Sequence, residues 1–211
     1  MPAEARKEFE KAEAAVATGK KDQLEAAVNH FEKALSLYPK FVQAQLGLGT
    51  AYMDLQQFDK AEQALKRTVE LDSRAANAMF ALGEIYLREN KYEDAEKVLL
   101  QGLQIEGRSF QGHLALARLY WDMASKTKDE TQAKPLLEKA YNRVNEALKL
   151  KPDLAQAHIV KGNLLLRVRR VADAQREFEE YLRLEPKGPL AEQTQVTVEK
   201  IKKALDSQPK P

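Results

Sequence analysis

Apolar and small side chains recur along this chain with two superimposed spacings. Within a segment they fall three or four residues apart, which places them on one face of an α-helix. The segments themselves recur every 34 residues: Tyr86 follows Tyr52 at that distance, and Ala95 follows Ala61. Self-similarity at a fixed period of this length is typical of a helical solenoid, in which each unit is a pair of helices.

Five units fit one register. They begin at Glu8, Val42, Ala76, Phe110 and Ala155. The eighth residue of every unit is small: Ala15, Gly49, Gly83, Ala117 and Gly162. The twentieth residue is always alanine: Ala27, Ala61, Ala95, Ala140 and Ala174. Because helices that cross closely need a small residue at the contact, these positions predict where the two helices of a unit meet.

The pattern predicts an all-α chain. Helices are expected at about 3–18, 23–38, 41–55, 58–72, 75–89, 92–106, 109–126, 131–151, 154–168 and 171–185. Each unit ends on a turn residue, as at Pro39 and Pro152. A last helix at 189–206, after Gly188-Pro189, is expected to cap the array with a polar outer face. We predict a single domain, 1–206, with repeats 8–41, 42–75, 76–109, 110–154 and 155–188, and a disordered tail, 207–211.

The fourth repeat contains an insertion. Eleven extra residues lie between Tyr120 and Ala140, in a polar stretch that both flanking helices could absorb. We expect them to lengthen both helices of the fourth repeat by about 1.5 turns each. The hairpin could be a contact arm or a tolerated surface insertion, and the second is favoured. Trp121, at its base, is an interface residue or a cap on the hairpin's own core, and again the second is favoured.

Several motifs resemble the tetratricopeptide repeat family. The resemblance covers residues 8–188 and rests on Leu48-Gly49-x-x-Tyr52 with Ala61, on Leu82-Gly83-x-x-Tyr86 with Ala95, and on Gly162, Ala174, Phe178 and Pro186. The first repeat departs most, with Ala15 and Thr18 where the family has glycine and tyrosine. The resemblance implies a right-handed α-solenoid whose first helices line a concave groove.

In this family the second, fifth and ninth residues of each repeat would point into that groove. The second residues of repeats two to five are all side-chain amides, the fifth are apolar, and the ninth are mostly polar. The expected groove residues are Gln43, Leu46, Thr50, Asn77, Phe80, Glu84, Gln111, Leu114, Arg118, Gln156, Ile159 and Asn163. Amides can donate to and accept from a peptide backbone. They could instead serve the helix starts, and part of the apolar set could be core.

The sequence predicts a non-catalytic scaffold or adaptor that binds a protein or peptide. Cysteine is absent, the glycines form no phosphate-binding loop, and we expect neither a cofactor nor a metal. His113 and His158 could share a metal, but packing roles are favoured. The clamp that binds chaperone C-terminal carboxylates in some relatives needs cationic pairs that this chain lacks, so that ligand is not expected.

Charge and hydropathy narrow the remaining possibilities. The net charge of +2 argues against binding nucleic acid, and no apolar run is long enough for a membrane span. The run from Arg167 to Arg170 could meet an acidic partner, although cations at a helix C-terminus also favour the helix dipole. We expect a cytoplasmic monomer. Two alternatives stay open: a docking module of a larger, possibly exported, enzyme, and a self-assembling structural protein.

Overall fold

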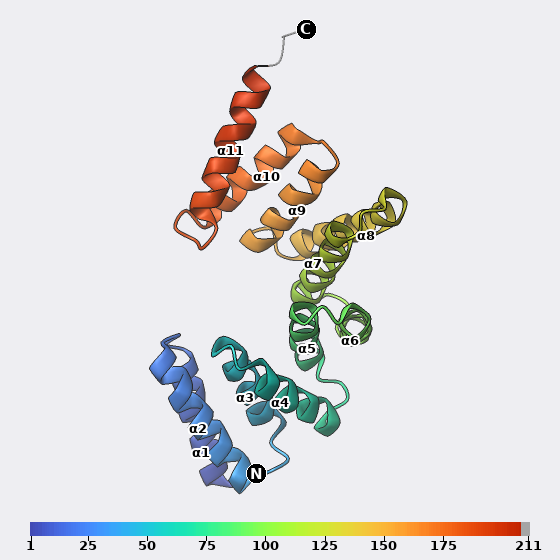
Figure 1. Cartoon of the computed structure of the whole chain (residues 1–211). Coiled ribbons are helices and arrows are strands. Elements are labelled where there is room, and N and C mark those ends of the chain that lie inside the picture. The colour runs from blue at the N-terminus through green and yellow to red at the C-terminus, as the bar shows by residue number, and fades with distance from the viewer. Residues whose placement is uncertain (208–211) are drawn as a thin grey trace. The chain divides into compact units, whose positions relative to one another are not determined.

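The computed structural model describes residues 1–207, and this part is all-α, as expected (Figure 1). Its helices are α1 (Ala3–Val16), α2 (Lys21–Leu37), α3 (Val42–Asp54), α4 (Phe58–Leu71), α5 (Ala76–Arg88), α6 (Tyr92–Ile105), α7 (Phe110–Lys126), α8 (Glu130–Leu150), α9 (Ala155–Arg167), α10 (Val171–Leu184) and α11 (Ala191–Asp206). Every predicted helix overlaps one of these. The predicted disordered tail, 207–211, lies outside the described residues from 208 onward.

The chain divides into two compact units, Met1–Gly107 and Arg108–Pro211. In the first unit α1 with α2, α3 with α4, and α5 with α6 form helical hairpins, and α2 packs on α3 and α4 on α5. In the second unit α7 pairs with α8 and α9 with α10, and both α7 and α8 contact α9. Helix α11 packs on α10, where a cap was expected. The single domain 1–206 stays a prediction.

Glycine at the eighth position marks the contact within a hairpin, as predicted. A Cβ added at Gly83 of α5 would lie 2.4 Å from Cδ2 of Leu99 on α6. Two other repeats have the same contact, between Gly49 and Leu65 and between Gly162 and Phe178. In each case the large side chain of the second helix fills the space that a side chain on the first would need.

Four connections between the two helices of a repeat contain a residue in the left-handed region, two residues before the second helix begins. These residues are Gly19, Gln56, Asn90 and Arg169, with φ between 58° and 66°. In repeats two, three and five this is the fifteenth residue, but Gly19 comes three residues earlier in the register that begins at Glu8. The second helix of that repeat, α2, is correspondingly longer than α4, with 17 residues against 14.

The insertion is entirely helical. Helix α7 has 17 residues and α8 has 21, against 13 in α5 and 14 in α6. Three residues connect α7 to α8, and three connect α5 to α6. The insertion therefore adds four residues to α7 and seven to α8, so both helices are longer, as expected, but by unequal amounts. Asp129 caps α8 by accepting a hydrogen bond from the backbone N–H of Thr131 at 2.8 Å.

A buried carboxylate ties α1 to α2. The Glu8 side chain is 1% exposed, and its oxygens lie 2.7 Å from Nζ of Lys11, 2.7 Å from Nδ1 of His30 and 3.3 Å from Nζ of Lys33. Hydrogen bonds from Lys11, His30 and Lys33 hold the pKa of Glu8 down to about 2. The two helices of the first repeat, which matches the family pattern least, are thus joined by buried polar contacts.

Candidate partner-binding surface

The four amides at the second position of the repeats are all exposed. They are Gln43, Asn77, Gln111 and Gln156, and each lies in the first turn of α3, α5, α7 or α9. The N-cap residues of α3, α5 and α9 make no side-chain capping hydrogen bond, and the amides lie two residues after them. Gln111 is different, because its Oε1 accepts a hydrogen bond from the hydroxyl of Ser109 at 3.2 Å.

The apolar fifth residues fall into two classes. Leu46 and Ile159 are half-buried and keep some exposed surface. Phe80 and Leu114 are only 4% and 7% exposed, so they do not present a surface to a ligand. Phe80 is buried against a glycine of the next helix. A Cβ added at Gly102 of α6 would lie 2.5 Å from Cε1 of Phe80, so the missing side chain of Gly102 makes room for the ring. Burial therefore removes Phe80 and Leu114 from the expected groove residues and agrees with the alternative that part of the apolar set is core.

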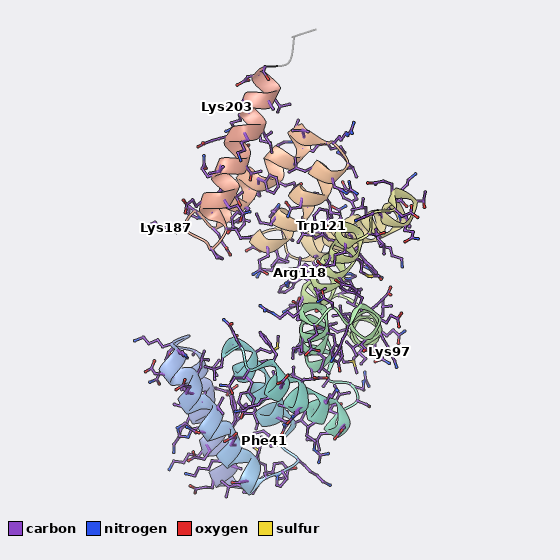
Figure 2. The ribbon with its side chains drawn as sticks, viewed as in Figure 1. Phe41, Lys97, Arg118, Trp121, Lys187 and Lys203 are labelled. Atoms are coloured by element: carbon purple, nitrogen blue, oxygen red, sulfur yellow. The ribbon has the colours of Figure 1, made fainter. Side chains whose placement is uncertain are left out.

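The ninth residues vary in exposure. Thr50 is exposed, and its hydroxyl donates to the carbonyl of Gly47 at 3.0 Å. Glu84, Arg118 and Asn163 are half-buried. Arg118 and the half-buried Trp121 both belong to α7 (Figure 2).

Some of the helices that carry these residues are neighbours within a unit. In the second unit α7 contacts α9, so the residues on these two helices belong to neighbouring elements. In the first unit α3 and α5 both pack against α4. We call the exposed or half-buried members of the set on α3 and α5, within the first unit, the first-helix face, and those on α7 and α9 of the second unit are equivalent to them by position in the repeat. One continuous groove through all four helices stays a prediction.

A hollow of about 460 Å³ opens beside Gln43. Its lining includes Phe9 of α1 and the pair Tyr38 and Phe41, which precede α3. The ring centroids of Phe9 and Phe41 are 4.8 Å apart. Sequence reasoning missed this hollow, although one signal was present: Phe9 stands at the second position of the first repeat, where the others have amides.

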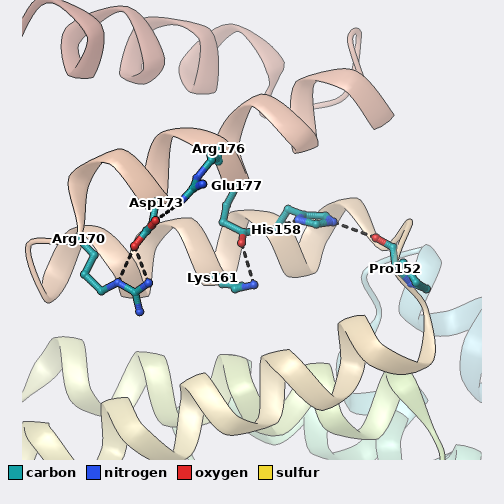
Figure 3. A network of polar contacts seen from close by, with 7 residues as sticks. All are labelled: Pro152, His158, Lys161, Arg170, Asp173, Arg176 and Glu177. Carbon is teal, nitrogen blue, oxygen red and sulfur yellow. Dashed lines mark hydrogen bonds and ion pairs between the residues drawn. The ribbon is translucent and has the colours of Figure 1, made fainter. Parts of the chain in front are cut away.

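The fifth repeat contains a charged network (Figure 3). Nδ1 of His158 lies 2.7 Å from Oε2 of Glu177, and Nε2 lies 3.0 Å from the carbonyl oxygen of Pro152. Because both neighbours accept hydrogen bonds, both ring nitrogens must donate, and this requires the protonated imidazolium. Nζ of Lys161 is 2.8 Å from the other oxygen of Glu177.

The network shifts two pKa values. Burial lowers the pKa of His158, but the hydrogen bonds to Glu177 and Pro152 outweigh it, and the pKa lies above its ordinary value. Burial raises the pKa of Glu177, but His158 and Lys161 outweigh it, and that pKa lies below its ordinary value. His158 was expected to pack inside the repeat, and it does so as a buried polar residue that contacts a carboxylate. That carboxylate, Glu177, lies 19 residues away, and no local motif indicated the pair.

Among residues 1–207 there is no group of three or more histidine, aspartate or glutamate side chains placed to hold a metal ion. No helix in that same part of the chain has the length and apolar character that crossing a bilayer requires.

Two sequence profiles described as tetratricopeptide repeat match the chain, one over residues 46–112 and the other over residues 14–41. These two stretches of the chain are tetratricopeptide repeats. The matched residues lie in the first unit and the start of α7, and the second unit repeats the same hairpin contact at Gly162 and Phe178.

Solved tetratricopeptide repeat structures share the fold. The type IV pilus biogenesis factor PilW is 16% identical, with a TM-score of 0.79 over 98% of this chain and 88% of that one. MamA is 21% identical, with a TM-score of 0.64 over 89% and 94%. YrrB, described as having an unusual peptide-binding site, is 15% identical, with a TM-score of 0.57 over 90% of both chains. No curated protein matches the sequence.

Proposed function

We propose that this chain is a non-catalytic adaptor that holds an extended segment of a protein partner on its first-helix face. The observation that carries the proposal is that the amides at the second position of repeats two to five are all exposed. Arrays of this family act as interaction modules, and a solenoid presents an extended surface rather than an enclosed reaction site.

The amides suit an extended peptide because each has both a donor and an acceptor. Gln43, Asn77 and Gln156 are exposed, so their hydrogen-bonding groups are accessible to a ligand. A backbone presents donors and acceptors regardless of sequence, so these contacts would supply affinity more than selectivity.

Selectivity would come from apolar contacts. Leu46 and Ile159 keep exposed apolar surface, and the hollow beside Gln43 has aromatic walls from Phe9, Tyr38 and Phe41. A large apolar side chain of the partner fits this hollow, because aromatic walls contribute area and stacking geometry. YrrB, which has the same fold, is described as having a peptide-binding site.

Site-specific cross-linking tests the proposal. The chain has no cysteine, so a single introduced thiol is unique. Gln43→Cys and Asn77→Cys place a photo-activated cross-linker on the first-helix face. Gln63→Cys and Gln101→Cys are matched controls, because both are exposed glutamines on the second helices α4 and α6.

We expect the same protein from a lysate of the source organism to be cross-linked at positions 43 and 77 and not at positions 63 and 101. Circular dichroism should show equal helix content in all four variants, since each replaced side chain is exposed. Cross-links of equal yield from both sets, or from neither, would contradict the proposal.

A further inference from the structure

The connection between the fourth and fifth repeats, residues 151–154, is held by the side chain of His158. It lies between the end of α8 and the start of α9. Within it the N–H of Leu154 donates to the carbonyl of Lys151 at 3.3 Å, which is long for such a bond. Pro152 has no N–H to donate. Its carbonyl accepts a hydrogen bond from Nε2 of His158 at 3.0 Å, and this bond ties the connection to α9 (Figure 3).

The same ring contacts α10 through its other nitrogen. Nδ1 of His158 is 2.7 Å from Oε2 of Glu177, and both side chains are largely buried. Each ring nitrogen therefore faces an acceptor, whereas a neutral imidazole has only one N–H. The ring donates to both partners only when both nitrogens are protonated. The geometry thus makes the link from α10 through His158 to the connection dependent on the charge of the ring.

Loss of the second proton affects the two bonds unequally. The carboxylate of Glu177 is a charged acceptor, and charge-assisted hydrogen bonds are roughly twice as strong as neutral ones. A neutral His158 therefore keeps its one N–H at Nδ1, toward Glu177. Nε2 then presents a lone pair to the carbonyl oxygen of Pro152, and two acceptors repel each other. The connection is the partner that the ring releases.

Two carboxylates of α10 favour the protonated ring. Glu177 accepts its hydrogen bond, and the charge of Glu180 acts in the same direction. Burial lowers the pKa of His158, but these groups and the carbonyl of Pro152 outweigh it, so the pKa lies above the ordinary value of 6.5. The proton is therefore retained to higher pH than on a histidine in water.

Lys161 keeps α9 and α10 together when the ring is neutral. Its Nζ lies 2.8 Å from Oε1 of Glu177, so that carboxylate retains a cationic partner after His158 loses its charge. Glu180 is paired with Arg183 at 2.6 Å. From α8, Tyr141 lines the same hollow as Lys161 and Glu177. Deprotonation of the ring therefore leaves the two helices joined.

The fourth residue of a repeat, which is His158 in the fifth, differs in the others. It is Gln45 in the second and Met79 in the third, and neither side chain titrates. In the fourth repeat it is His113, whose Nδ1 lies 3.5 Å from a guanidinium nitrogen of Arg143 on α8. A guanidinium only donates, so this ring nitrogen accepts and has no proton. Two histidines at the same repeat position thus have opposite requirements for charge.

We propose that His158 is a pH-dependent latch on the connection between the fourth and fifth repeats. The protonated ring holds residues 151–154 against α9 and α10, and loss of the proton frees them while the two helices stay paired. Gln156 lies in the first turn of α9, directly after the connection. The latch therefore sets how firmly one of the proposed partner contacts is held, and this consequence alone rests on the proposed function.

Nuclear magnetic resonance of the free chain between about pH 5.5 and pH 9 tests the proposal, since this range brackets histidine titration. Imidazole signals give the midpoint of each histidine, and isotope-labelled proline carbonyls report the bond at Pro152. His158→Gln and Pro152→Ala assign the two signals. We expect the Pro152 carbonyl signal to move with the midpoint of His158. Above that midpoint, hydrogen exchange of amides 154–157, corrected for intrinsic rate, should become about tenfold faster.

Three variants assign the response to the latch. In His158→Gln the movement of the Pro152 carbonyl signal with pH should be absent. Glu177→Gln should lower the midpoint of His158 by about one pH unit, because it removes the charge of the bonded carboxylate and keeps the shape of the side chain. His113→Gln is the matched control, since it removes a histidine from the same position of the neighbouring repeat, and it should leave the Pro152 response unchanged.

Three results would overturn the proposal. The first is a Pro152 carbonyl signal that does not change with pH, and the second is the same change in His158→Gln as in the wild type. The third is faster exchange throughout α9 and α10 at the same midpoint, since this would show that the whole repeat loosens. No partner is present in these measurements, so their outcome is independent of the proposed function.

Discussion

The eighth residue of a repeat shows how a single missing side chain sets the distance between two helices. At Gly83 the Cγ and Cδ atoms of Leu99 occupy the volume where a Cβ would be. Alanine is favoured over glycine inside a helix by up to ~1 kcal/mol, so glycine is retained here against helix propensity. Packing between the two helices therefore decides this residue.

We expect Gly83→Ala to lower the free energy of unfolding by about 1–3 kcal/mol, because overpacking outweighs the gain in helix propensity. Urea denaturation followed by circular dichroism measures the loss. In the double variant with Leu99→Ala the two effects should not add, since the new methyl group fills part of the cavity. Additive effects would show that the Cβ does not meet Leu99.

Gln56 is a second residue whose conformation matters more than its side chain. Its φ of 58° is in the left-handed region, where residues with a Cβ are strained by ~1–2 kcal/mol. We expect Gln56→Gly to raise the free energy of unfolding by about 0.5–1 kcal/mol, after the entropy that glycine adds to the unfolded chain. Its neighbour Gln57 has φ of −91°, so Gln57→Gly should give no gain in the same urea experiment.

At the scale of elements, side chains from distant parts of the sequence join helices that apolar packing already brings together. His158 of α9 links Glu177 of α10 to the carbonyl of Pro152, in the connection that precedes α9. Three segments of the second unit thus meet at one imidazolium. The bonds form only with the ring protonated, so this junction responds to pH.

The direction of the pH effect follows from the two pKa shifts. His158 has a raised pKa, so its contribution to stability is complete below the ordinary value of 6.5 and is lost as pH rises through the folded-state value. Glu177 has a lowered pKa, so its contribution is present above 4.5 and is lost as pH falls through its folded-state value. Both contributions are complete between pH 4.5 and pH 6.5.

We therefore expect the wild type to lose more stability than His158→Gln as pH rises from about 6 to 8. Urea midpoints at several pH values measure the difference between the two proteins. His30 and His113 are present in both, so their effects cancel. Parallel profiles would show that His158 does not carry a proton in the folded state.

At the scale of the whole molecule, the chain comprises two compact units, each with helical hairpins of its own. A solenoid is stabilised by contacts between neighbouring repeats, so a piece that contains several intact interfaces can fold by itself. The first unit has the α2–α3 and α4–α5 interfaces between hairpins. The second has the contacts of α7 and α8 with α9, and its end is covered by α11.

We expect fragments 1–107 and 108–211 each to be helical and to unfold cooperatively in urea. Circular dichroism of the separate fragments measures both properties. The second fragment should lose its cooperative transition when α11 is removed as well, because the apolar face of α9 and α10 that includes Leu165 and Phe178 would be exposed. A fragment 1–107 without a cooperative transition would show that its interfaces are insufficient.

The sequence by itself determined the helices, their pairing and the site of the insertion. The 34-residue period and the small residues suffice to predict these features. The reason is that contacts such as Gly83 with Leu99 join residues at the same separation in one hairpin after another. It also placed Gln43, Asn77, Gln111 and Gln156 correctly on the surface, since polar side chains at the start of a helix seldom lie in a core.

Only the tertiary structure decided which apolar residues are covered and which charges meet. Phe80 is buried because a glycine 22 residues later leaves room for its ring, and no local pattern reports that. The pairing of His158 with Glu177 and of Arg167 with Glu130 likewise joins different helices. The hollow between α8 and the end of α9 likewise depends on how far α8 extends, which the three-dimensional packing of the fourth and fifth repeats sets.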